Sequence, residues 1–339
     1  MTRRGEFELI ASLFAPLSRM ASGALGLTDD VALIDVAPDC ELVATIDTVI
    51  AGVHFRVDDP PDLVARKALR VNLSDLAAKG ARPLGVLQAI TLSEATDDSY
   101  LERYALGLGE DLRHFGIPLL GGDTTAHRPA TVPGRGGPFT ITIAALGEVP
   151  RGQAILRRGA RPGDLVCVSG TIGDAALGLL ALEGRLPACT HAHYDMLVRR
   201  YRLPEPRLAL GQSLRGLATA CVDISDGLCA DIGHICEASG VRAELKWHAL
   251  PVSAAAQRRL ADDPSLRQFI LGGGDDYELA FTLPSSHRAR VQELAMRHDM
   301  PVAVIGRVRE SSDSEKNGVT VLGDDGEPMP VEKSGFTHV

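Results

Sequence analysis

Aromatic residues are scarce in this chain of 339 residues, at 4% of the sequence. So few aromatic side chains argue against the stacking platforms on which proteins bind single-stranded nucleic acid. The net charge of -9 points the same way, because nucleic-acid-binding domains are usually basic. We therefore expect no nucleic-acid partner.

Long apolar runs are also missing, and no stretch approaches the roughly 20 residues that span a bilayer. Glu6 and Glu8 interrupt any apolar region behind the basic residues at the N-terminus, which argues against a signal peptide. The six cysteines form no C-x-x-C pair and are typical of reduced, buried thiols. These features predict a cytoplasmic protein without a membrane partner.

The common nucleotide-binding and nucleophile motifs are absent as well. The sequence has no P-loop, no Rossmann glycine fingerprint between a strand and a helix, and no H-R-D or D-F-G of the protein kinases. It also lacks a G-x-S-x-G elbow and a paired Cys-His signature, so a covalent nucleophile is not indicated. Any nucleotide would have to be held by a different scaffold.

What is present describes an ordinary globular protein of two domains. Apolar residues make up 45% and charged residues 23% of a chain whose length suits two cores. The composition shifts to arginine, glycine and proline at 157–164, so we predict domains at 1–150 and 151–339. Helical and strand patterns mix without strict alternation, which favours an α+β or mixed α/β fold.

Hydrophobic periodicity predicts the elements of each half. In the first half we expect helices at 5–18, 61–79 and 97–115, and strands at 31–36, 41–50, 84–92, 117–120 and 139–149, with a Pro- and Gly-rich loop at 126–138. In the second half we expect strands at 165–169, 221–224, 241–247, 277–283 and 302–309, and helices at 174–183, 192–201, 206–219, 228–236 and 286–298.

The stretch from Ala44 to Phe55 is organised unusually for a structural strand. Period-2 alternation places Thr45 and Asp47 on one face and Ile46 on the other, and His54 follows on a glycine turn. A carboxylate and a hydroxyl on one face, followed by an imidazole, suggest a site. The plainer alternative is an edge strand with a solvated aspartate and a surface histidine.

Further carboxylates stand at strand or helix ends, mostly beside glycine or hydroxyl residues, and Asp75 lies within an otherwise apolar helix. They are Asp29, Asp30, Asp75, Asp123, Asp223, Asp226, Asp275 and Asp276. Taken one by one, several have structural interpretations, such as a turn at Asp29-Asp30, an Asx-turn at Asp123 or an N-cap at Asp226. Taken together, an oxygen-rich set that is poor in Cys and His selects Mg²⁺ or Mn²⁺ and suits phosphoryl transfer.

The ordered motifs resemble one family. Thr28-Asp29-Asp30, Thr45-Ile46-Asp47 with Gly52-Val53-His54-Phe55, the run 72–77 (NLSDLA), Gly121-Gly122-Asp123-Thr124, the run 223–228 (DISDGL) and the run 273–279 (GGDDYEL) are together similar to the thiamine-monophosphate kinases. The resemblance covers nearly the whole chain. It implies the two-domain fold of the aminoimidazole-ribonucleotide-synthetase-like ATP-binding superfamily, with a homodimer formed by the N-terminal domains.

The resemblance also implies an activity and a set of site residues. The activity is ATP-dependent phosphorylation of thiamine monophosphate to thiamine diphosphate, by direct in-line transfer. Several Mg²⁺ ions are implied, and a monovalent cation is a further candidate. The implied metal ligands are Asp30, Thr45, the backbone of Ile46, Asp47, Asp75, Asp123, Asp223 and Asp226. ATP is expected at Gly122, Asp123, Arg157 and Ser225, and thiamine monophosphate at His54, Asp275 and Phe336.

Three positions depart from the family pattern, and two rivals stay open. Ile46 stands where a hydroxyl residue is common, Asp275 where glutamate is common, and Phe336 where tryptophan is common. These changes leave the substrate pocket more open to question than the metal site. The rivals are another ATP-dependent enzyme of the same superfamily, such as aminoimidazole ribonucleotide synthetase, and a non-catalytic nucleotide- or metal-binding module.

Overall fold

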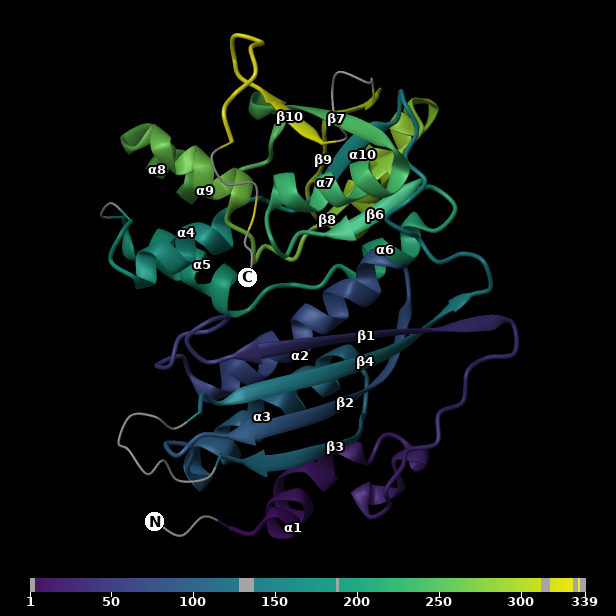
Figure 1. Cartoon of the computed structure of the whole chain (residues 1–339), viewed down its shortest axis with the longest axis vertical. Coiled ribbons are helices and arrows are strands. Elements are labelled where there is room, and N and C mark those ends of the chain that lie inside the picture. Colours follow the sequence, from purple (N-terminus) through teal and green to yellow (C-terminus); the bar gives the residue numbers. More distant parts are fainter. Residues whose placement is uncertain (1–3, 128–136, 187–188, 312–317, 332–334, 336–339) are drawn as a thin grey trace. The chain divides into compact units, whose positions relative to one another are not determined.

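The computed structural model divides into two compact units (Figure 1). It describes residues 4–127, 137–186, 189–311, 318–331 and 335. The first unit comprises Met1–Leu76 with Arg82–Gly152, and the second comprises Ala77–Ala81 with Gln153–Val339. We describe each unit by itself. No helix within the described ranges is both long enough and apolar enough to cross a membrane.

A four-stranded sheet forms the centre of the first unit. Its order is β1-β4-β2-β3, with β1 and β2 antiparallel to β4 and β3 parallel to β2. The bounds are Cys40–Ile50 for β1, Arg82–Leu92 for β2, Leu119–Ala126 for β3 and Thr140–Pro150 for β4. One face packs on helices, and the other carries exposed apolar residues such as Leu42 and Ile46.

Two long helices, α2 (Pro61–Ala78) and α3 (Asp98–Phe115), cover the packed face (Figure 1). Asp111 of α3 is fully buried and accepts from Arg70 Nε at 2.5 Å and from Arg66 Nε at 2.9 Å, both on α2. A buried carboxylate needs such partners, because an uncompensated charge away from water is costly. The ion pairs therefore fix α2 against α3, and α2 carries part of the site.

The N-terminal segment differs from its prediction. Residues 5–18 are helical but broken into α1 (Glu6–Leu9), a π-helical turn (Ile10–Phe14) and a 3₁₀ turn (Ala15–Ser18) with Pro16 at its start. The strand predicted at 31–36 is wrong. Its residues alternate in exposure, but among the described residues they pair with no strand, so the apolar positions Val31 and Leu33 stay exposed.

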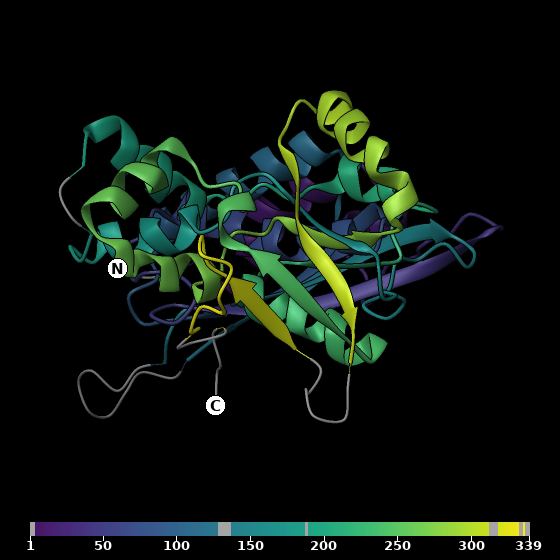
Figure 2. The same cartoon turned by 90° about the horizontal axis from the view of Figure 1, so that it is seen from above.

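A six-stranded sheet of order β10-β7-β9-β5-β8-β6 forms the second unit. Its strands are β5 (Leu165–Ser169), β6 (Ala220–Asp223), β7 (Val241–Lys246), β8 (Leu279–Leu283), β9 (Val302–Glu310) and β10 (Val319–Leu322). All neighbours are antiparallel except β10 and β7, which are parallel, and β7 lies between β10 and β9 (Figure 2). The strand β10 is an addition to the predicted set.

Helices pack on this sheet through an extensive apolar core. They are α4 (Asp174–Leu182), α5 (His191–Arg202), α6 (Leu208–Leu214), α7 (Leu228–Ser239), α8 (Ala254–Asp262), α9 (Arg267–Gly272) and α10 (Arg288–His298). The fully buried Leu177, Leu228 and Leu271 come from α4, α7 and α9. The helix predicted at 206–219 is shorter than expected, and α8 and α9 were not predicted.

Candidate active site

In the first unit, polar side chains of β1 and α2 face each other. The Thr45 hydroxyl donates to Asp75 Oδ2 at 2.5 Å, and the Asp47 N–H donates to Asn72 Oδ1 at 3.1 Å. Strand alternation puts Thr45 and Asp47 on the helix side, and the three-residue spacing on α2 puts Asn72 and Asp75 on one helix face. The result is a cluster of oxygen donors held by two rigid elements.

Asn72 is a member of this cluster that sequence reasoning did not single out. Its amide nitrogen donates to Ala68 O at 3.0 Å, so the side chain is fixed at both ends. The signal was available, since Asn72 lies one helical turn before Asp75. Ile46 is 65% exposed on the opposite face of β1, so only its backbone lies between Thr45 and Asp47.

His54 lies on a tight turn directly after β1. Its Nδ1 accepts the N–H of Ile50 at 3.0 Å, and its carbonyl accepts from Nζ of the buried Lys67 at 3.0 Å. Phe55 is buried beside it and anchors the turn. Because Nδ1 accepts this N–H, Nε2 is the ring nitrogen of His54 that carries a proton and can donate.

The Gly-Gly-Asp motif lies inside strand β3, whereas the sequence predicts a strand only over the first part of this segment. This location excludes the Asx-turn interpretation of Asp123. A Cβ at Gly122 would lie 1.9 Å from Gln88 O on β2, so glycine is required where the two strands approach. Asp123 is exposed and lines the same cavity as Asp29 and Asp30.

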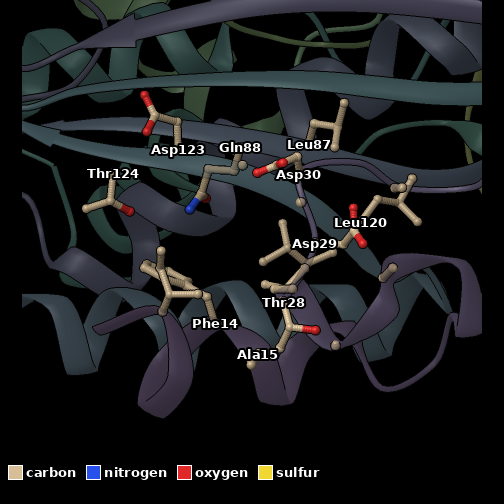
Figure 3. Close-up of a pocket in the computed structure, with 18 of the residues that line it drawn as sticks. Phe14, Ala15, Thr28, Asp29, Asp30, Leu87, Gln88, Leu120, Asp123 and Thr124 are labelled. Carbon is tan, nitrogen blue, oxygen red and sulfur yellow. The ribbon is translucent and has the colours of Figure 1, made fainter. Parts of the chain in front are cut away.

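That cavity has a volume of about 680 Å³ and lies between β2 and β3 on one side and the N-terminal segment on the other (Figure 3). Its described lining combines carboxylates with apolar side chains and contains no cationic residue. The lining comprises Glu6, Phe7, Ile10, Ala11, Phe14, Ala15, Ala24, Gly26, Leu27, residues 28–32, Leu87, Gln88 and residues 119–124.

In the second unit, the acidic motif 223–227 joins β6 to α7. Asp223 ends β6 and is buried, and Ser225 and Asp226 follow at the turn. The backbone N–H groups of Ser225, Asp226 and Gly227 all donate to Asp231 Oδ2, at 3.1, 3.0 and 3.1 Å. Gly227 occupies the N-cap of α7 without a side-chain hydrogen bond, so Asp226 is not the N-cap.

Asp231 is a second residue that sequence reasoning missed. Burial, followed by the neighbouring charges of Asp223 and Asp226, raises the pKa of Asp231 to about 8. Oxygen or nitrogen atoms of Asp226, Asp231 and His234 lie within 4.8 Å of one another. Asp223 and Asp226 are thus close enough to Asp231 to disfavour its ionised form, in addition to the effect of burial.

The loop 273–278 lies against the acidic turn. Asp275 N–H donates to Ser225 O and Tyr277 N–H donates to Ile224 O, both at 2.8 Å. Asp275 and Tyr277 have φ values of 63° and 50°, an uncommon conformation for residues with side chains. The structure thus brings the backbone of Asp275 next to that of Ser225.

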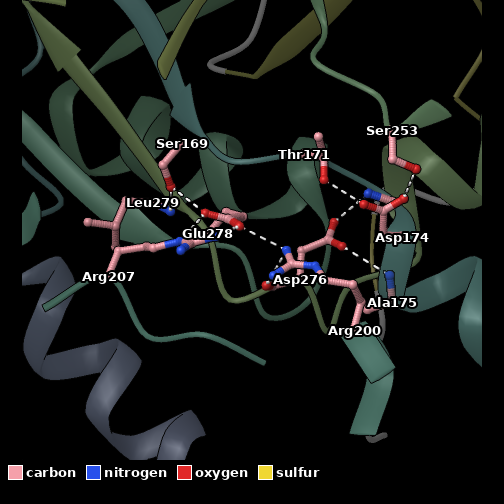
Figure 4. A network of polar contacts seen from close by, with 11 residues as sticks. Ser169, Thr171, Asp174, Ala175, Arg200, Arg207, Ser253, Asp276, Glu278 and Leu279 are labelled. Carbon is pink, nitrogen blue, oxygen red and sulfur yellow. Dashed lines mark hydrogen bonds and ion pairs between the residues drawn. The ribbon is translucent and has the colours of Figure 1, made fainter. Parts of the chain in front are cut away.

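A buried network holds this loop in place (Figure 4). Asp276 accepts the N–H groups of Gly173 and Ala175 at the start of α4, at 2.6 and 3.3 Å. Glu278 accepts from Arg200 at 2.8 Å, from Arg207 at 2.5 and 2.7 Å, and from Ser169 at 2.6 Å. Burial alone would raise the pKa of Glu278, but the two arginines outweigh it and the net shift is downward.

Two predicted site residues remain, Arg157 and Phe336. Arg157 is exposed, and within the described residues its guanidinium has no hydrogen bond or ion pair; its carbonyl accepts from Ser239 Oγ at 3.4 Å. Gly335 packs against Ala230 and Asp226, where a Cβ would come within 2.5 Å of the Ala230 Cβ. Phe336 lies outside the described residues.

Comparison with known proteins gives two matching family segments. Residues 28–149 match the N-terminal domain of the AIR synthase related proteins, and residues 161–316 match their C-terminal domain. The chain is 40% identical over 337 residues to the thiamine-monophosphate kinase of Escherichia coli strain K12, covering 98% of each chain.

Solved structures agree with this result. The thiamine-monophosphate kinase from Stenotrophomonas maltophilia K279a superposes with a TM-score of 0.80 at 40% identity, covering 94% of this chain and 98% of that one. AaThiL complexed with AMPPCP and TMP superposes with a TM-score of 0.75 at 29% identity, covering 100% of both chains. The mixed α/β fold of two such domains and the similarity along nearly the whole length agree, and the chain belongs to the thiamine-monophosphate kinase family.

Proposed function

We propose that this protein transfers the terminal phosphoryl group of ATP to thiamine monophosphate and releases thiamine diphosphate and ADP. The observation that carries the proposal is the 40% identity to a thiamine-monophosphate kinase over 98% of the chain. The structural relative AaThiL, which is complexed with AMPPCP and TMP, supports the same pair of substrates.

The proposed metal site consists of oxygen donors in each unit. Thr45, Asp47 and Asp75 with the Ile46 carbonyl and Asp30 and Asp123 would hold Mg²⁺ in the first unit, and Asp223 and Asp226 in the second. The fit is supported by the donor chemistry, since Mg²⁺ prefers carboxylate, hydroxyl and carbonyl oxygens. The carboxylates of Asp223 and Asp226 add to the effect of burial in raising the pKa of Asp231 to about 8, and a cation bound at these two carboxylates would offset their charge. A monovalent cation remains a candidate for the same donors.

The chain's own residues would bind and orient the two phosphates. Gly122, Asp123, Ser225 and Arg157 are the proposed contacts of ATP, and Asp275 and Phe336 are proposed contacts of thiamine monophosphate. His54 would donate from Nε2 to the acceptor phosphate, because its Nδ1 already accepts the Ile50 N–H. When bound, Mg²⁺ would supply charge neutralisation between the two phosphate groups.

Direct in-line transfer fits this arrangement. The acceptor phosphate is itself the attacking group, so the protein needs positioning and electrostatic stabilisation and no covalent nucleophile. We assign ATP and Mg²⁺ binding and dimer formation to residues 1–150, and completion of the active site to residues 151–339. We further propose a cytoplasmic enzyme, in keeping with its six free thiols.

The open face of the first sheet supports the proposed homodimer. Leu42 is 50% and Ile46 65% exposed, and Ala44 lies between them on the same face of β1. Ala144 and Leu146 of β4 pair with Ile46 and Ala44 and extend this apolar strip. A strip of apolar side chains across two strands is typical of a surface that a partner covers.

A product assay tests the proposal. Purified protein is incubated with Mg·ATP and thiamine monophosphate, and thiamine diphosphate is measured by fluorescence after oxidation and chromatography. We expect thiamine diphosphate from thiamine monophosphate and none from free thiamine. Aminoimidazole-pathway and selenide substrates are run in parallel, with circular dichroism to verify folding. A folded protein that forms no thiamine diphosphate would refute the assignment.

A further inference from the structure

The cavity of the first unit contains one polar side chain that neither the family motifs nor the proposed metal site uses. Gln88 on β2 is 5% exposed and lines this cavity beside Gly122. Its Oε1 accepts from the hydroxyl of Tyr104 on α3 at 2.7 Å. Among the described residues its amide nitrogen has no hydrogen-bond partner, and this nitrogen is directed into the cavity (Figure 3).

Tyr104 fixes the orientation of this amide. The tyrosine is fully buried, and its hydroxyl has no other hydrogen-bond partner among the described residues. Burial raises the pKa of Tyr104 well above its ordinary value, so the hydroxyl keeps its proton and must donate. Gln88 Oε1 is the acceptor, and the NH₂ end is therefore presented to the cavity as a donor. A buried polar group that faces a cavity without a partner is costly unless a ligand or water satisfies it.

The walls around Gln88 suit an uncharged planar ring. Phe14 lies on the wall opposite Gln88 (Figure 3), and Leu119, Leu120 and Leu87 add further apolar surface. No described lining residue is cationic, so this interior offers nothing to a phosphate group. The carboxylates that would hold Mg²⁺ and phosphates, Asp30 and Asp123, line the same cavity. A nucleotide could thus place its base inside and its phosphates toward these carboxylates.

We propose that Gln88 recognises the adenine of ATP by donating from its amide N–H to a ring nitrogen, and that Tyr104 positions the amide for this contact. This inference rests on the proposed function, because it assigns the cavity to the nucleotide and not to thiamine monophosphate. Tyr104 acts through Gln88 and is a positioning residue. The cavity would therefore select a nucleotide base that has an acceptor nitrogen in the plane of its ring and that packs against the apolar walls.

The test measures nucleotide binding at equilibrium, independently of turnover. Calorimetry with Mg²⁺ and AMPPCP compares the wild type with Gln88→Leu, Tyr104→Phe and the double variant Gln88→Leu/Tyr104→Phe. The double variant removes both partners of the buried hydrogen bond, which limits the folding cost of leaving one unpaired. Gln257→Leu is the matched control, since Gln257 is an exposed amide on α8 that donates to Val252 O.

We expect Gln88→Leu and the double variant to weaken AMPPCP binding about three- to tenfold, as loss of one hydrogen bond predicts. Tyr104→Phe should weaken it less, and Gln257→Leu should have no effect. The KM for thiamine monophosphate should not change. In a second arm, ATP is compared with 1-deaza-ATP and 7-deaza-ATP. The wild type should bind the analogue that lacks the accepting nitrogen more weakly than it binds ATP. The Gln88→Leu variant should bind the two with similar affinity.

Three results would overturn the inference. The first is a folded double variant that binds AMPPCP as tightly as the wild type does. The second is a Gln88→Leu variant in which only the KM for thiamine monophosphate changes. The third is a Gln88→Leu variant that still discriminates between the ATP analogues as the wild type does. A wild-type protein that binds AMPPCP but forms no thiamine diphosphate would instead refute the kinase assignment, and the comparison at Gln88 would still decide the inference.

Discussion

At the scale of single residues, the proposed metal site depends on carboxylates whose backbone is fixed by neighbouring groups. Asp47 shows this best, because its own N–H donates to Asn72 Oδ1 at 3.1 Å while its side chain is exposed. This hydrogen bond fixes the position of the Asp47 backbone, and the alternation of side chains along β1 fixes the face on which its carboxylate lies. A substitution that changes only the charge should therefore separate catalysis from folding.

Asp47→Asn should reduce kcat by at least about 100-fold, because the carboxylate is a proposed ligand of the ion that neutralises the phosphates. The thermal unfolding midpoint should move by only a few degrees, as is usual for an exposed side chain. Steady-state kinetics across a Mg²⁺ titration, together with calorimetric melting, measures both. Asp39→Asn, at an exposed turn before β1, is the control and should behave as wild type. Near-normal turnover of Asp47→Asn would remove Asp47 from the metal site.

At the scale of elements, two loops of the second unit meet through their backbones. Gly274 has a φ of 73°, and a Cβ there would lie 2.3 Å from Ser225 O. The neighbouring Asp276 and Glu278 hold the same loop to α4, Arg200 and Arg207. The uncommon backbone conformation of Asp275 is thus maintained by buried contacts on its C-terminal side, as expected where structure supports a strained site.

Gly274→Ala should push the loop away from Ser225 and displace Asp275. We expect the KM for thiamine monophosphate to rise several-fold, with a loss of about 2–3 kcal/mol in the free energy of unfolding from the left-handed φ and the steric clash. Gly240→Ala is the matched control. Gly240 has a similar φ of 66°, but nothing lies within 4 Å of its Cβ position.

The control variant Gly240→Ala should lose only about 1 kcal/mol in the free energy of unfolding and keep its kcat and KM values. Urea unfolding and steady-state kinetics on both variants separate the effect of the left-handed φ, which both share, from that of the steric clash, which only Gly274→Ala has. Equal KM values for Gly274→Ala and the control would show that contact between the loops does not position Asp275.

At the scale of the whole molecule, the apolar face of the first sheet is the feature that the described residues leave exposed. Ile46, which departs from the family pattern by replacing a hydroxyl, is 65% exposed in the middle of this face. In the proposed dimer its side chain would lie in the interface, while its carbonyl would be the atom available to the proposed metal site. Strand alternation would thus separate the two proposed roles of Ile46, in the dimer interface and at the metal site.

Ile46→Glu should convert the proposed dimer into a monomer, because the charge would have to be buried in an apolar interface. Sedimentation velocity at micromolar concentration measures the change. Met296→Glu is the control, since Met296 is 75% exposed on α10 of the second unit and should leave association unaffected. A wild-type protein that sediments as a monomer, or a dimeric Ile46→Glu variant, would contradict the proposed interface.

Local pattern was enough to predict most of the fold. β1 and α2 carry clear periods of 2 and 3.6, so their places and the common face of Thr45 and Asp47 were readable. The segment 31–36 alternates in the same way but has no partner strand among the described residues, and pairing cannot be read from one segment alone. The same limitation concealed that the motif at Gly122 lies inside β3, paired with β2.

The sequence by itself determined the fold class, the family and the set of acidic residues, because these depend on composition, period and motif order. Tertiary structure alone decided which polar atoms meet. Asn72 opposite Asp47 and Tyr104 behind Gln88 depend on contacts between different elements. Asp231 depends on the turn that folds the N–H groups of residues 225–227 back onto its carboxylate. Such contacts are set by packing and by the need to satisfy buried polar groups, which no local pattern encodes.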